Sequence, residues 1–171
     1  KLDPDRQEKK IYNRIRRACD SMHQLTETLL WLSRKESKIP DPEPVDIRDL
    51  VTGLIQENRY LLEGKNVELI LEIRPAGVMI PMTAFKIAVG NIIRNAFQYT
   101  VQGVVRIELL QDKLIIENKT CAGVGKNAAD YGFGLGLKLV KQICSKLNLS
   151  YKSRNLQEGH QAILSWEKIS R

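Results

Sequence analysis

Residues 91–100 read Asn-Ile-Ile-Arg-Asn-Ala-Phe-Gln-Tyr-Thr. Asn91 and Asn95 are one helical turn apart, so both side chains point the same way if this segment is helical. Their neighbours are apolar, and two amides on one helical stripe need polar partners. Two explanations are open: the amides cap or brace the backbone, or their neutral oxygens face a hydrated cation.

Residues 131–137 read Tyr-Gly-Phe-Gly-Leu-Gly-Leu, which places three glycines in alternation at the start of a predicted helix. Free amide hydrogens and the positive end of the helix dipole attract phosphate oxygens at such a start, and glycines let them come close. A flexible hinge is the alternative explanation. Together with the asparagine pair, the motif favours a site for a phosphate-bearing ligand.

The elements around these motifs predict a mixed α/β domain after residue 46. Asp46 is a suitable cap for a helix through Leu62, and Gly64 for its left-handed stop. Pro81 opens the helix that carries both asparagines and runs to about Tyr99. The segment 119–131 has no periodicity and is long enough to need a function. Strands are predicted at 67–73, 78–80, 103–110, 113–118, 149–153 and 161–166, and a further helix at 134–147.

The N-terminal segment has a coiled-coil pattern. Its apolar positions alternate at intervals of four and three residues, which is the heptad period. They are Ile11, Ile15, Ala18, Met22, Leu25, Leu29 and Leu32. The pattern predicts a bundle or dimer, with packing of this helix on its own chain as the alternative. A proline at every second position then predicts a linker at 39–45.

Length and composition limit the possible architectures. The 171 residues suit one compact domain plus one extra element, and the net charge of +7 raises the possibility of an acidic partner. No apolar run is long enough for a membrane span, and the N-terminus lacks the apolar core of a signal peptide. The three cysteines are far apart and form no CxxC pair. We therefore expect a soluble chain in a reducing, cytoplasmic setting.

The two motifs, in this order around a long loop, resemble those of the sensor histidine kinases of two-component signalling. Residues 91–100 resemble the N box of this family, 132–137 resemble its second glycine box, and 119–131 stand where its ATP lid lies. Residues 15–34 resemble the second helix of the hairpin that dimerises and carries the phosphoryl group. The resemblance implies an α+β fold, a two-layer ATP-binding (Bergerat) sandwich of a mixed sheet and three helices after a long coiled-coil helix.

The resemblance also implies domain bounds and site residues. Residues 1–38 would be the second hairpin helix, with the first helix absent, 39–45 the linker, and 46–171 the catalytic ATP-binding domain. Asn95 would be the catalytic residue that coordinates Mg²⁺ bridging the phosphates of ATP. The residues expected to bind the nucleotide are Asn91, Asn95, Tyr99, Asn118, Gly132, Gly134, Gly136 and Leu137.

The sequence departs from the family pattern at three places. Asn118 stands where the family usually has an aspartate that accepts from the adenine amino group, which loses roughly 1 kcal/mol of charge assistance. Lys119-Thr120-Cys121 replaces the glycines expected next, and Gln98 replaces a commonly basic residue that meets the phosphates. We therefore expect weaker nucleotide binding than usual, or an altered lid conformation.

The resemblance also bears on the phosphoacceptor histidine and on the partners of the protein. The two histidines, His23 and His160, lack the motif that marks the family's phosphorylated histidine, and His160 is most simply a turn residue. The resemblance implies a homodimer through the hairpin helices, a response regulator receiver domain as partner, and the cytoplasmic portion of an inner-membrane sensor. The alternative is a pseudokinase that docks a regulator with weak or no ATP turnover. Nucleic acid is not an expected partner, because acidic residues interrupt the basic N-terminal helix and no aromatic set accompanies it.

Overall fold

The computed structural model describes residues 40–121 and 135–167, together with residues 8, 11, 12, 15, 16, 18, 19, 22, 26 and 30. The chain divides into two compact units, Lys1–Ser37 and Lys38–Arg171. None of the helices in the described residues combines the length and the hydropathy of a membrane span.

The described residues of the first unit are all helical. The Thr26 hydroxyl donates to the Met22 carbonyl oxygen at 2.9 Å, a bond across one helical turn. Three large residues of the heptad stripe are described, and their exposed fractions are 50% for Ile11, 59% for Ile15 and 68% for Met22. This part of the predicted stripe is therefore apolar and accessible. The remaining leucines, Leu25, Leu29 and Leu32, lie outside the residues whose side chains are described.

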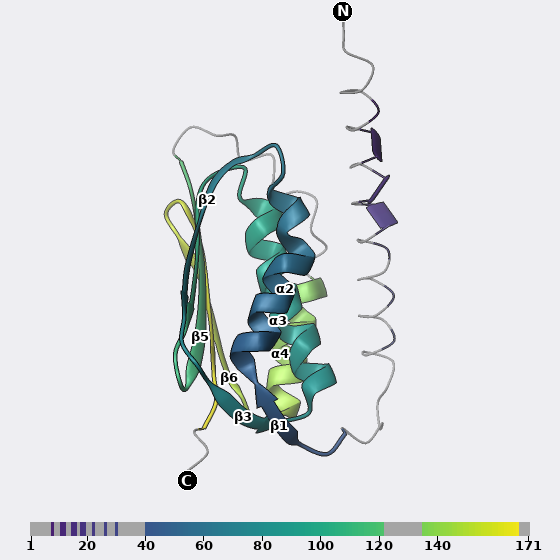
Figure 1. The fold of residues 1–171 in the computed structure, drawn as a ribbon, viewed down its shortest axis with the longest axis vertical. Coiled ribbons are helices and arrows are strands. Elements are labelled where there is room, and N and C mark those ends of the chain that lie inside the picture. The colour runs from purple at the N-terminus through teal and green to yellow at the C-terminus, as the bar shows by residue number, and fades with distance from the viewer. Residues whose placement is uncertain are drawn as a thin grey trace, which may run out of the picture. The chain divides into compact units, whose positions relative to one another are not determined.

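The second unit contains a mixed five-stranded sheet in the order β2-β4-β5-β7-β6. β2 and β4 are parallel, and the other neighbours are antiparallel. Three helices cover one face of the sheet (Figure 1), as the α+β sandwich prediction requires. The strands are β2 (Asn66–Ile73), β4 (Gln102–Leu109), β5 (Lys113–Thr120), β6 (Ser150–Leu156) and β7 (Gly159–Ser165). The helices are α2 (Ile47–Asn58), α3 (Met82–Tyr99) and α4 (Leu135–Lys146).

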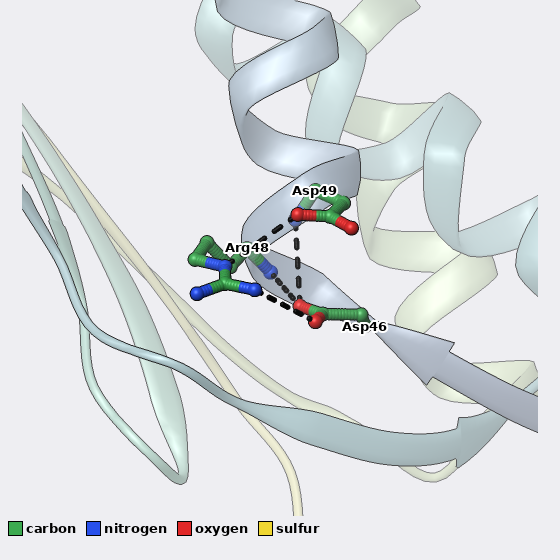
Figure 2. Close-up of polar contacts among 3 residues, drawn as sticks. All are labelled: Asp46, Arg48 and Asp49. Atoms are coloured by element: carbon green, nitrogen blue, oxygen red, sulfur yellow. Dashed lines mark hydrogen bonds and ion pairs between the residues drawn. The ribbon is translucent and has the colours of Figure 1, made fainter.

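The first helix of this unit has the predicted cap and the predicted glycine stop, although its last predicted turn is a 3-10 turn. The Asp46 carboxylate accepts from the backbone amides of Arg48 at 2.9 Å and Asp49 at 3.4 Å, which satisfies free donors of the first turn (Figure 2). α2 passes into a 3-10 turn, η1 (Arg59–Leu62). Gly64 then has a φ of 72°, the left-handed conformation expected of a helix stop.

Part of the predicted Pro-rich linker, residues 43–45, forms a strand that the sequence pattern did not indicate. Glu43–Asp46 forms strand β1, which pairs antiparallel with β3 (Gly77–Ile80) and places Pro44 opposite Met79. Proline is tolerated because this two-stranded ribbon leaves one side of β1 unpaired. Alternating prolines are not typical of a strand, so the sequence does not predict β1. Its pairing also depends on a partner more than thirty residues away.

The core lies between the sheet and α3. Phe85, Ile93 and Phe97 of this helix have no exposed surface, and neither do Val105, Ile107 and Leu109 of β4. Phe85 also meets the ring of Trp166 edge to face, with 5.9 Å between centroids. The apolar stripe of α3 is thus fully used in packing, which fixes the rotation of the helix and the direction of its polar residues.

The end of β5 is held tightly between its two neighbours. Gly103 of β4 has a φ of 136°, and a Cβ there would overlap the Lys119 carbonyl oxygen. A Cβ on Gly159 of β7 would overlap the Asn118 carbonyl oxygen. Two glycines therefore allow the strands on both sides to approach β5 where Asn118 lies.

We expect Gly103→Ala to lower the free energy of unfolding by about 3 kcal/mol, because the Cβ meets backbone and the φ is unfavourable. Gly53→Ala is the matched control: Gly53 lies inside α2 with open space around it, so the same change should stabilise the protein by ~1 kcal/mol. Denaturant unfolding followed by circular dichroism measures both. Equal effects of the two substitutions would contradict the close approach at β5.

Candidate functional site

The fold gathers the predicted motifs at one end of the sheet. The Cys121 amide, just after β5, donates to the Gln102 carbonyl at 3.1 Å, and Gln102 follows the end of α3 by three residues. Asn118 is therefore near the last turn of α3. α4 finishes beside the opposite end, because β6 begins with Ser150 paired to Ser165, whose other partner is Lys113. The start of α4 consequently lies at the Asn118 end.

The structure separates the roles of the two asparagines on α3. Asn91 is buried, and its Nδ2 donates to the Ile87 carbonyl oxygen at 2.8 Å, so its amide nitrogen braces the helix. Asn95 is half-buried one turn later, and its amide has no hydrogen-bond partner among the described residues. The bracing explanation holds for the Asn91 nitrogen, whereas the Asn95 amide is available to a ligand.

A lysine far away in the sequence secures the last turn of this helix. Lys65 Nζ donates to the carbonyl oxygens of Phe97 at 2.6 Å and Gln98 at 2.9 Å. The final carbonyls of a helix lack internal partners and carry partial negative charge, so an ammonium group stabilises them. Sequence reasoning missed Lys65, because no local pattern connects it to a helix end 32 residues downstream.

Tyr99 is the last residue of α3 and lies in its final turn. Its side chain is half-buried, and burial raises the pKa of the phenol. The ring is therefore neutral at physiological pH and presents an apolar face with a polar tip. This character suits packing beside a planar, partly polar ligand.

Asn118 lies on the sheet face that the helices cover. It alternates with the buried residues Leu114 and Ile116, and its own exposed fraction is 7%. Its neighbours in register are Val105 on β4 and His160 on β7. No described residue forms a hydrogen bond with its side chain. Among the described residues, the buried side-chain polar atoms without a partner are limited to the Tyr151 hydroxyl, so the Asn118 amide retains access to solvent and a ligand can contact it.

His160 lies in strand β7 rather than in a turn, which corrects the sequence-based expectation. It is the second residue of β7, opposite Asn118, and its Nε2 is 2.8 Å from the Ser153 hydroxyl of β6. Burial lowers the pKa of the imidazole, and no charged neighbour contributes. The sequence predicts a turn at His160 because the strand begins directly at the Glu158-Gly159 turn signal. His23 lies outside the described residues.

The glycine motif is only partly described. Gly136 and Leu137 lie in the first turn of α4, and both are half-buried. Gly132, Gly134 and residues 122–131 of the predicted lid (119–131) lie outside the described residues, whereas Lys119 and Thr120 belong to strand β5. Within the described residues, no cluster of histidine, cysteine or acidic side chains is suited to hold a metal ion. A cation here would have amide oxygens and ligand phosphates as its partners, which fits the Asn95 amide.

Solved structures of histidine kinases have the same fold. The cytoplasmic segment of histidine kinase QseC matches with a TM-score of 0.60 at 24% identity, over 87% of this chain and 94% of that chain. Histidine kinase AdeS from Acinetobacter baumannii matches with a TM-score of 0.60 at 18% identity, over 99% and 87%. The ATP binding domain of PrrB from Mycobacterium tuberculosis matches with a TM-score of 0.55 at 21% identity, over 77% and 100%.

These similarities are of structure. No protein-family model matches the sequence, and the comparison with curated proteins finds no match. The chain has the fold of a histidine kinase catalytic, ATP-binding domain, with a mixed five-stranded sheet and three helices. The predicted fold class is confirmed.

The environment of His160 predicts a pH dependence of stability. Burial depresses the pKa of this histidine below its ordinary value of 6.5, so the unfolded chain takes up the proton first as the pH falls. Stability should therefore decline below about pH 6.5, and His160→Gln should remove part of that decline. Chemical unfolding of both proteins between about pH 7 and about pH 5 measures it. Parallel curves for the two proteins would show that His160 contributes nothing.

Proposed function

We propose that the chain is the catalytic part of a sensor histidine kinase that binds Mg-ATP and transfers the γ-phosphoryl group to a histidine outside this chain. The observation that carries the proposal is a pair of amides, Asn95 and Asn118, for which no described residue is a hydrogen-bond partner. They lie at the end of the sheet where α4 begins. The kinase fold supports it.

The roles follow from the chemistry of each group. Asn118 would accept from the adenine amino group, and Tyr99 would pack beside the nucleotide. The start of α4, with Gly136 and Leu137, offers backbone amides and the positive end of its dipole to phosphate oxygens. Gly132 and Gly134 would extend that cradle, and Asn91 would line the same pocket.

Asn95 is the proposed metal ligand. Mg²⁺, when bound, would neutralise charge between the phosphates. The Asn95 oxygen would hold it in place, and the protein would contribute position and charge neutralisation to an in-line transfer rather than covalent chemistry. Lys65 supports this role indirectly, since it anchors the helical turn that follows Asn95.

We also propose that the protein works as a dimer in signalling. The accessible apolar stripe of Ile11, Ile15 and Met22 favours a partner helix, because burying each methylene contributes ~0.8 kcal/mol. A homodimer through hairpin helices would bring a histidine to the catalytic domain. The phosphoryl group would pass on to a response regulator, and the chain would be the cytoplasmic portion of a membrane sensor.

A specific observation favours a second candidate, a pseudokinase that serves for docking. β5 continues as a strand through Thr120, whose amide donates to the Glu158 carbonyl at 2.7 Å. In the sensor histidine kinases that the sequence resembles, glycines are expected directly after the position of Asn118. A strand held by Gly103 and Gly159 leaves less freedom there than a loop, which would reduce nucleotide turnover.

The substitution Asn95→Ala tests the kinase proposal. We expect it to weaken Mg-ATP binding to the full chain by at least about tenfold, because an amide ligand of the metal is lost. Gln56→Ala, an exposed amide on α2, is the control that should leave binding unchanged. Isothermal titration calorimetry measures both. Unchanged affinity in Asn95→Ala would remove Asn95 from the site, and absence of binding in the wild type would favour the pseudokinase.

The substitution Met22→Gln tests dimerisation through the stripe. It keeps the side-chain length and adds a polar group at an apolar position, so we expect the dimer dissociation constant to rise about tenfold. Arg16→Gln is the control, since Arg16 lies outside the stripe on the same helix. Sedimentation over a concentration series measures the association. An equal effect of both substitutions would argue against the stripe as the interface.

A further inference from the structure

Three asparagines are buried in the described residues, and hydrogen bonds set the amide orientation of two of them. Asn58, Asn91 and Asn118 have exposed fractions of 3%, 6% and 7%. Nδ2 of Asn58 donates to the Leu54 carbonyl at 2.8 Å, and Nδ2 of Asn91 donates to the Ile87 carbonyl at 2.8 Å. A carbonyl accepts only from the amide nitrogen, so these bonds decide which way each amide faces. The Asn118 side chain forms no such bond with any described residue.

The strand neighbours of Asn118 do not select an orientation either. Val105 is apolar, and burial lowers the pKa of the His160 imidazole, which favours its uncharged form. The nearest charges along β5, Glu117 and Lys119, point to the opposite face of the sheet and pair with each other at 3.0 Å. Neither charged neighbour on β5 therefore determines whether the amide oxygen or the amide nitrogen of Asn118 faces a ligand.

We infer that Asn118 reads the nucleotide base in either amide orientation, so that the site accepts 6-oxopurine nucleotides as well as adenine nucleotides. This inference rests on the proposed function, since it takes Asn118 to face the base. With the oxygen forward, the amide accepts from the 6-amino group of adenine; with the nitrogen forward, it donates to a 6-carbonyl group. A carboxylate offers acceptors only and would meet that carbonyl with its own negative charge.

The test compares ATP with inosine triphosphate, which bears the 6-carbonyl without the additional amino group of guanine. Calorimetry of the full chain with Mg²⁺ should give dissociation constants within about fivefold, because both contacts are neutral hydrogen bonds. Asn118→Asp should prefer ATP by at least about thirtyfold, since a buried carboxylate facing a carbonyl loses its partner.

Asn155→Asp is the matched control. Asn155 is exposed on β6 and stands in the same register row, opposite His160, so the substitution adds the same charge to the same sheet. It should change the affinities for both nucleotides equally and leave their ratio unaltered.

The outcomes separate this inference from the proposed function. A wild-type preference for ATP of more than about thirtyfold, or equal ratios in wild type and Asn118→Asp, would overturn the inference and leave the kinase proposal standing. Failure to bind either nucleotide would overturn both. If circular dichroism shows that Asn118→Asp does not fold, the wild-type ratio decides alone.

Discussion

The packing of α3 against the sheet is the contact on which the rest of the second unit depends. Phe85, Ile93 and Phe97 are fully buried there, and burial of each such side chain contributes about 2 to 3 kcal/mol. Because large side chains fill the interface, the helix has one rotation and one height relative to the strands. Asn91 and Asn95 lie on that same helix, so the apolar contacts decide where both amides point.

The candidate site is formed where regular structure ends. The last turn of α3, the end of β5 and the start of α4 provide amides and backbone donors, and described residues place no metal-binding acidic cluster there. The surplus of positive charge, +7 for the chain, therefore says little about how phosphates would be held. Backbone groups at a helix start suit phosphate oxygens, whereas exposed lysines and arginines serve mainly solvation.

Much of the fold was predictable because its signals are local. Asp46 as a cap, Gly64 as a stop and the alternation along β2 each reflect the conformational preference of a few adjacent residues. Strand β1 was missed because its pairing with β3 depends on a distant segment. The turn predicted at His160 is wrong for a similar reason: the position of His160 opposite Asn118 is a consequence of strand register, which local composition does not encode.

The sequence by itself determined the class of fold, the elements and the spacing of the two motifs, since hydrophobic period, caps and glycines act over one or two turns. Only the tertiary structure decided which polar groups have partners. It committed the Asn91 nitrogen to the helix backbone and left the amides of Asn95 and Asn118 without a partner among the described residues. It also brought Lys65 to the last turn of α3 and His160 opposite Asn118. Hydrogen bonding between distant residues depends on where packing places them, and that placement exists only in the folded chain.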